Sequence, residues 1–150
     1  MDTVMRRTGR VLPIHDGRVL LIRGGDPRRP EAGEWWFTVG GGCEDGESPA
    51  DAARREAFEE AGIELPDDLG PVVLRRETSF EFDGEWLEQV EDYYLCEVGT
   101  DSVATSGWNE LERRVFTAQR WWPVDELRTT SEVVHPAGLG ELLADLLARQ

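Results

Sequence analysis

A glycine-rich turn that joins a short β-rich run to a helix constrains this chain more than any other feature. The run is Trp-Trp-Phe-Thr-Val at 35–39, and three glycines follow it directly. Segment 48–62 has the signals of a helix: Ser48 can accept a hydrogen bond from a free N–H of the first turn, and Pro49 suits the first helical position. Gly62 suits the left-handed conformation that often ends a helix. The sequence therefore predicts a strand, a glycine loop and a helix in direct succession.

The expected helix carries a row of acidic side chains beside its apolar stripe. At about 100° per residue, Glu56, Glu59 and Glu60 fall within an arc of about 100°. The adjoining arc is a row of alanines that should face the sheet: Ala53, Ala57 and Ala61. The carboxylates are therefore expected next to the buried stripe and not opposite it.

Carboxylates at this spacing repel one another, and partial burial increases the penalty unless a cation compensates. Hard divalent ions prefer oxygen ligands, and Mg²⁺ typically takes one or two carboxylates together with substrate phosphates. The cluster therefore indicates a Mg²⁺ or Mn²⁺ site that opens toward a phosphate-bearing ligand. The alternative is a solvated acidic face, which is the commoner meaning of glutamates clustered on a helix.

The remaining elements follow from alternation, turn signals and helical spacing. They are strands at 7–14, 18–23, 72–82, 85–98 and 114–123, a polar loop at 99–110, and a helix at 139–147. Asp-Gly pairs join the first two strands and the next two as hairpins. No repeat or linker divides the chain, so one α/β domain is expected over 1–150.

Charge excludes several classes of partner. The chain has 31 acidic and 16 basic residues, a formal net charge of −15, which argues against binding to nucleic acid or to a membrane surface. No apolar run approaches the length of a membrane span, and two cysteines are too few for a disulfide framework. A cytoplasmic location is the resulting expectation. An anionic substrate would need metal ions and local basic side chains such as Arg23, Arg28 or Arg29.

The joint spacing distinguishes a metal site from a solvated face. Segment 41–63 matches the pattern G-x5-E-x7-R-E-U-x-E-E-x-G-U, where U is aliphatic, with these residues in place: Gly41, Glu47, Arg55, Glu56, Glu59, Glu60, Gly62 and Ile63. Ala57 fills the first aliphatic position, and Val39 stands where many relatives have proline before the glycines. The segment resembles the signature of the Nudix hydrolase family. The resemblance implies an α/β/α sandwich around a mixed β-sheet.

The resemblance also implies a ligand set for the metal. Glu56 and Glu60 would be the principal ligands, and Glu59 would complete the site directly or through bound water. The carbonyl of Gly41 would add another oxygen. Mg²⁺ or Mn²⁺ is the cofactor implied.

Catalysis requires a base that takes a proton from the attacking water. In similar proteins the base is a glutamate of the motif, here Glu59, or an acidic residue on a later loop, here Glu110 or Glu112. We favour Glu112, because an Arg-Trp-Trp run closely follows it as in similar bacterial members; the alternative is a solvated loop glutamate. Arg55 is expected to pair with Glu47 and hold the loop against the helix, a structural role with catalytic consequences.

The family acts on nucleoside diphosphates linked to another moiety and splits a phosphoanhydride bond. Arg23, Gly41 and Gly42 are the residues expected to contact such a substrate. Nucleoside triphosphates, ADP-ribose and nucleotide sugars stay open as substrates. The alternative function is a nucleotide-sensing Nudix domain without catalysis. A homodimer is common among family members, although nothing in this sequence identifies an interface.

Several tryptophans are candidates for the substrate cleft. Trp35 and Trp36 should point to opposite faces of their strand, so one is expected in the core and the other can face the cleft. Trp86, beside the second hairpin, is compatible with a base pocket or a dimer contact. Trp108, in a polar loop, is a candidate for a substrate lid.

Overall fold

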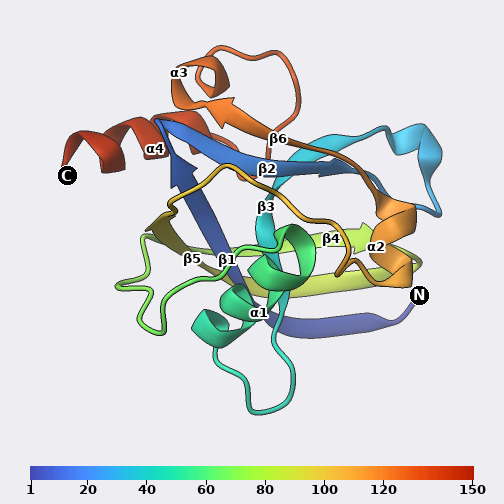
Figure 1. Ribbon diagram of the computed structural model, residues 1–150. Helices are drawn as coiled ribbons and strands as arrows, with labels where there is room; N and C mark the ends of the chain where they lie inside the picture. Colours follow the sequence, from blue (N-terminus) through green and yellow to red (C-terminus); the bar gives the residue numbers. More distant parts are fainter.

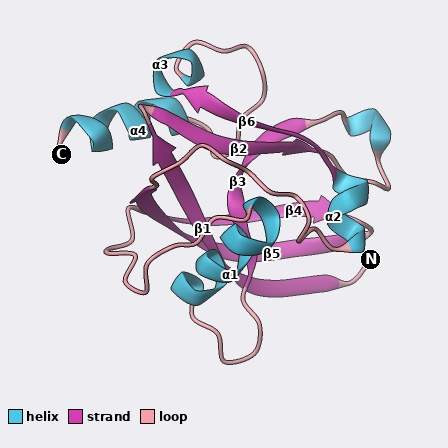
Figure 2. Ribbon diagram, in the orientation of Figure 1, coloured by secondary structure: helices cyan, strands magenta, loops and turns pink.

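The computed structural model describes residues 1–150. Its strands and helices are arranged around one sheet (Figures 1 and 2). The strands are β1 (Thr3–His15), β2 (Arg18–Gly24), β3 (Trp35–Gly42), β4 (Leu74–Phe82), β5 (Glu85–Glu97) and β6 (Phe116–Pro123). The helices are the 3₁₀ turn η1 (Pro30–Ala32) and α1 (Pro49–Ala61), α2 (Glu110–Val115), α3 (Val124–Leu127) and α4 (Leu139–Ala148). No helix is both long enough and apolar enough to cross a membrane.

The sheet is mixed, as expected. Its order is β4-β5-β1-β3-β2-β6, and β1 also pairs with β2. The long pairing of β1 with β5 is parallel, whereas the other pairings are antiparallel. In Figure 1 the first half of β1 lies with β5 and β4, while β2 and β6 lie together away from them. These two parts of the sheet diverge on the side where α2 is placed.

Helices cover both faces of the sheet, so the α/β/α sandwich is confirmed. Alternate residues of each central strand enter different cores: Val11 packs toward α1, and Leu12 packs toward α3 and α4. Tyr93 and Tyr94 divide in the same way. The period of two along a strand is the reason that one strand can supply both cores.

Helix α1 forms where the sequence predicts it and for the expected reasons. The Ser48 hydroxyl accepts a hydrogen bond from the Asp51 N–H at 3.1 Å, and Pro49 is the first helical residue. Gly62 ends the helix with a φ of 70°. The alanine row, Ala53, Ala57 and Ala61, is buried against the sheet.

The region after the second hairpin differs from the sequence-based expectation. Residues 110–115 form helix α2, whereas the sequence analysis placed a loop to residue 110 and a strand from Arg114. A reciprocal cap explains the helix: Asn109 Oδ1 accepts from the Glu112 N–H at 2.8 Å, and the Glu112 carboxylate accepts from the Asn109 N–H at 3.0 Å. The short helix α3 was also not expected.

Candidate active site

The start of α1 lies directly on the backbone of β1. A Cβ added to Gly9 would be 1.7 Å from the carbonyl oxygen of Pro49, so only glycine permits this approach. Gly9 pairs with Gly41 across the β1–β3 ladder. Helix α1 is therefore seated close to the end of β3, where the glycine loop begins.

Gly40 connects that loop to the acidic face of the helix. Its φ is 142°, and a Cβ at this position would lie 2.2 Å from the carbonyl oxygen of Gly9. The Gly40 N–H donates to Glu60 Oε1 at 2.8 Å, and Glu60 is 3% exposed. From the other side, Arg10 Nη1 donates to the carbonyl oxygens of Thr38 and Gly40 at 3.1 and 3.2 Å. The end of β3 thus holds the Glu60 carboxylate in one orientation.

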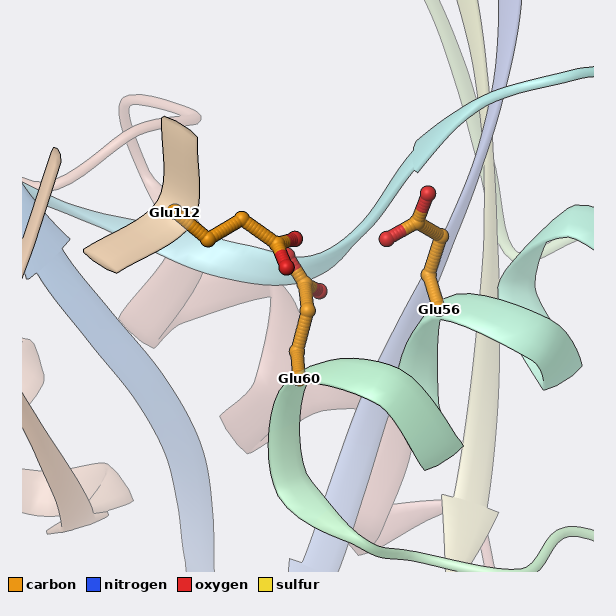
Figure 3. A group of neighbouring side chains, drawn as sticks. All are labelled: Glu56, Glu60 and Glu112. Atoms are coloured by element: carbon orange, nitrogen blue, oxygen red, sulfur yellow. The ribbon is translucent and has the colours of Figure 1, made fainter. Parts of the chain in front are cut away.

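Three carboxylates from two helices meet beside this loop. Glu56 and Glu60 come from α1 and Glu112 comes from α2, and each offers an oxygen within 4.8 Å of the others. Figure 3 shows Glu112 reaching across toward Glu60, with Glu56 one helical turn away on α1. Glu112 is 9% exposed, whereas Glu110 is exposed. Of the two later glutamates that the sequence left open, the structure therefore brings only Glu112 to the group.

Burial dominates the electrostatics of the group. Loss of hydration raises the pKa of Glu56, with a further increase from the charge of Glu112. Burial raises the pKa of Glu60 well above its ordinary value, and Glu56 adds to the effect. Burial likewise raises the pKa of Glu112. The arrangement is costly to the protein on its own and favours a bound cation.

Arg55 links the glycine loop to the helix. Its guanidinium donates to Glu47 through Nε and Nη2, both at 2.9 Å, and to the carbonyl oxygen of Gly42 at 3.0 Å. Nη1 donates to Glu56 Oε1 at 3.0 Å and to Glu59 Oε2 at 3.2 Å. The expected pairing of Arg55 with Glu47 is present in the structure, and its catalytic consequence stays a prediction.

The other residues that the sequence analysis assigned to the site are placed as follows. Glu59 is bound to Arg55 and lies outside the group of three. Gly41 lies against Glu56, since a Cβ there would be 2.8 Å from the Glu56 carboxylate, and Gly42 also lines the cleft described below. Arg23 is not among the cleft residues, and its guanidinium pairs with Glu34 at 2.8 Å. The roles of Glu59 and Gly41 as ligands stay predictions.

A cleft of about 610 Å³ opens beside the carboxylates. Glu56, Glu60 and Glu112 line one part of it. Aromatic rings line much of the remainder: Trp35, Phe37, Phe80, Phe82, Tyr93 and Phe116. The cleft therefore offers surfaces against which a planar ring can stack, close to the acidic group.

The tryptophans have different positions from one another. Trp36 is 6% exposed and packs in the core, whereas Trp35 lines the cleft, as their alternation predicts. Trp86 is 38% exposed and is not a cleft residue. Trp108 is anchored to α1: its indole donates to the carbonyl oxygen of Glu60 at 2.7 Å, and its ring packs edge-on against Phe116. It ties the polar loop to the end of α1. Its role as a substrate lid stays a prediction.

Sequence reasoning missed the basic residues that line the cleft, which are Arg6, Arg10 and Arg76. Arg6 and Arg10 lie on β1, and Arg76 lies on β4. No local motif marks them, because their grouping depends on the pairing of β1, β5 and β4. Glu112 did have a local signal, since Asn109 followed three residues later by glutamate is typical of a capped helix start.

Comparison with known proteins agrees with this geometry. The family model of the NUDIX domain matches residues 5–145. The MutT NUDIX hydrolase from Burkholderia pseudomallei is similar with a TM-score of 0.66 and 25% identity, over 91% of this chain and 95% of that one. A NUDIX-family hydrolase from Clostridium perfringens shares the fold with a TM-score of 0.67 and 18% identity, over 95% of this chain and 97% of that one.

Two further similarities extend the comparison. An Ap4A hydrolase from C. elegans shares the fold with a TM-score of 0.57 and 18% identity, over 96% of each chain. A stretch of 51 residues is 51% identical to part of the octanoyltransferase of Myxococcus xanthus. This stretch makes up 34% of this chain but only 13% of that protein. The match of the family model over nearly the whole chain, with the glutamate-bearing helix in place, shows that this protein belongs to the Nudix hydrolase family.

Proposed function

We propose that this protein hydrolyses a phosphoanhydride bond in a nucleoside diphosphate linked to another moiety, with Mg²⁺ or Mn²⁺ as cofactor. The observation that carries the proposal is the group of three buried carboxylates at the edge of the cleft. Their oxygens suit a hard divalent ion. Glu56 and Glu60 are the residues that would hold it, with Glu112 facing them.

Each residue of the group has a distinct part in the proposed mechanism. A bound divalent ion would neutralise the diphosphate and lower the pKa of a water molecule. Glu60 is oriented by the Gly40 N–H, and Glu56 is oriented by Arg55. Glu112 has one oxygen engaged by its own cap and a pKa raised by burial, so we assign it the proton that the water loses.

The substrate is proposed by chemical class. The cleft has aromatic walls for a base and an acidic group for metal-bound phosphates. Among the structural relatives, the C. elegans protein is named an Ap4A hydrolase and another is named a UDP-X diphosphatase. These names support a test panel of nucleoside triphosphates, ADP-ribose, UDP-sugars and Ap4A. We propose that the substrate lies within this range.

We expect at least one compound of the panel to be hydrolysed with Mg²⁺ or Mn²⁺ and none in EDTA. Glu112→Gln should lower kcat by roughly 10²- to 10⁴-fold, because glutamine keeps the cap but cannot take the proton. The matched control is Glu110→Gln, two residues earlier in the same helix and exposed, which should retain wild-type activity. Products are identified by chromatography so that the cleaved bond is known. Metal-independent turnover, or saturable binding without any product, would contradict the proposal.

The raised carboxylate pKa values predict how Mg²⁺ stabilises the fold. In EDTA, at pH values above the ordinary carboxyl pKa, the folded protein still holds protons on three side chains, Glu56, Glu60 and Glu112. The unfolded chain has released these protons in the same pH range. These groups therefore add stability at low pH that is lost as pH rises through their raised pKa values. Because Mg²⁺ requires the ionised form, its effect on Tm should be larger at pH 8 than at pH 5.

The measurement is thermal unfolding with Mg²⁺ and with EDTA across this pH range. The difference between the two curves isolates the metal site from other titrating groups, such as Asp92, whose pKa is lowered by Arg75. An equal Mg²⁺ shift at both pH values would show that the three carboxylates do not form the binding site.

A further inference from the structure

The cleft has a second polar centre, on strands rather than on helices. In the paired strands β1, β5 and β4, Arg6 lies beside Gln89, and Glu91 lies beside Arg76. Direct cross-strand partners share a face of the sheet, and residues two apart on one strand share it as well. All four side chains line the cleft and form part of its floor.

Glu91 is the centre of this floor. It is 2% exposed, and both of its oxygens are fully engaged. Oε2 accepts from Arg10 Nε at 3.2 Å and from Gln89 Nε2 at 3.0 Å, while Oε1 accepts from the Tyr93 hydroxyl at 3.1 Å and from Arg76 Nε. The carboxylate therefore fixes its neighbours and has no capacity left for a ligand.

Arg6 and Arg76 are each anchored through Nε alone. Arg6 Nε donates to Gln89 Oε1 at 2.7 Å, and Arg76 Nε donates to Glu91. Their terminal nitrogens, Nη1 and Nη2, make no hydrogen bond to the protein, and Arg6 has no ion pair. Burial, followed by the charge of Arg10, lowers the pKa of Arg6, and the nearby carboxylates, of which Glu91 has the largest effect, offset this only in part.

The balance of charge on the floor is opposite to that of the whole protein. Three arginines, Arg6, Arg10 and Arg76, surround Glu91 on this floor, in a chain with a net charge of −15. The acidic group also acts on them, Glu56 on Arg6 and Glu60 on Arg10. A half-buried guanidinium with free, pre-oriented N–H groups is well suited to bind a phosphoryl group. The carboxylates at the edge of the same cleft are suited to metal ions instead, so the cleft has two chemically different ends.

We propose that the terminal nitrogens of Arg6 and Arg76 form an anion subsite on the cleft floor that takes a phosphoryl group of the substrate. The proposal rests on the proposed function in that the ligand is a nucleotide. It deepens that function by naming the groups that hold phosphate without a metal. It also gives this role to Arg6 and Arg76 in place of Arg23, which pairs with Glu34 outside the cleft.

The test is calorimetric titration with ADP in EDTA, where no metal can bridge phosphate to the carboxylates. We expect the wild-type protein to bind ADP at least tenfold more tightly than adenosine, and the affinity for ADP to fall as salt is raised. Arg6→Gln and Arg76→Gln should each weaken ADP binding by about 10- to 100-fold, the effect of losing a charge-assisted hydrogen bond in a shielded site. Arg6→Lys should restore part of the affinity.

The chain supplies a matched control. Arg7 is the neighbour of Arg6 on β1, but its side chain is 62% exposed and lies near Asp92 at 3.9 Å. Arg7→Gln should bind ADP like the wild type. Equal affinity of the wild type for ADP and adenosine in EDTA would overturn the proposal, and so would wild-type ADP binding by both cleft variants. Because the wild-type comparison needs no variant, a variant that fails to fold does not remove the test.

Two further ligands identify where the phosphoryl group comes from. If ADP loses more affinity than adenosine 3′,5′-bisphosphate in Arg76→Gln, the subsite holds the diphosphate. The reverse order assigns it to a phosphate on the ribose, and both results support an anion subsite. If the wild-type protein hydrolyses no compound of the panel with metal but still binds ADP in EDTA, the proposed function is refuted and the anion subsite is not.

Discussion

Glu60→Gln is expected to lower metal-dependent kcat by roughly 10²- to 10³-fold while the fold becomes at least as stable as the wild type in EDTA. Glutamine can still accept the hydrogen bond from the Gly40 N–H, so the backbone geometry is preserved. It cannot provide a charged ligand. At the same time it removes a buried carboxylate whose ionisation is opposed by burial and by Glu56.

The two readouts are steady-state kinetics with Mg²⁺ and chemical unfolding in EDTA at pH 8. The stabilisation that Mg²⁺ gives the wild type should largely disappear in Glu60→Gln. Glu64→Gln, an exposed glutamate just beyond the end of α1, is the control and should change neither readout. Reduced activity together with a large loss of stability would show that Glu60 is structural and would contradict its assignment to the metal.

Gly9→Ala is expected to destabilise the protein by at least about 3 kcal/mol, a larger effect than any single substitution at the cleft surface. The new Cβ would lie 1.7 Å from the Pro49 carbonyl oxygen and 2.9 Å from the Ala53 nitrogen, which are backbone atoms of α1. A backbone contact cannot be relieved by a rotamer change. Helix α1 would have to move away from β1.

Urea unfolding measures this effect, and the response to Mg²⁺ measures its consequence for the site. A displaced α1 carries Glu56 and Glu60 with it, so the variant should also need a higher Mg²⁺ concentration for half-maximal activity. Gly99→Ala, which has open space around the added Cβ, should remain within about 0.5 kcal/mol of the wild type. If Gly9→Ala also changed the free energy of unfolding by no more than about 0.5 kcal/mol, α1 would not pack against β1 as closely as described.

Helix α1 shows how far local patterns reach. Its cap at Ser48, its end at Gly62 and the arc of glutamates beside the alanine row all depend on residues within a few turns of one another. Such features are encoded by hydrogen bonds and spacing along one segment, and the structure has them where the sequence predicts them. The same reasoning failed at α2. The strand predicted from the alternating residues after α2 was started too early in the chain, so that it included the end of the helix.

Glu112 illustrates a partly predictable residue. The spacing from Asn109 to Glu112 is a local signal for a helix start, and the family resemblance already favoured Glu112 over Glu110. That its carboxylate lies within 4.8 Å of Glu56 and Glu60 follows from the tertiary placement of α2 relative to α1, which no spacing in the chain encodes.

By itself, the sequence determined the family, the acidic helix and the sandwich architecture, because periodicity, caps and the motif act over short stretches of chain. Only the tertiary structure decided which arginines line the cleft. Arg6 and Arg76 are 70 positions apart and come to the same cleft through the registers of β1 with β5 and of β5 with β4. Strand pairing brings distant residues onto one face, and a register shift of one residue would turn both guanidinium groups away from the cleft.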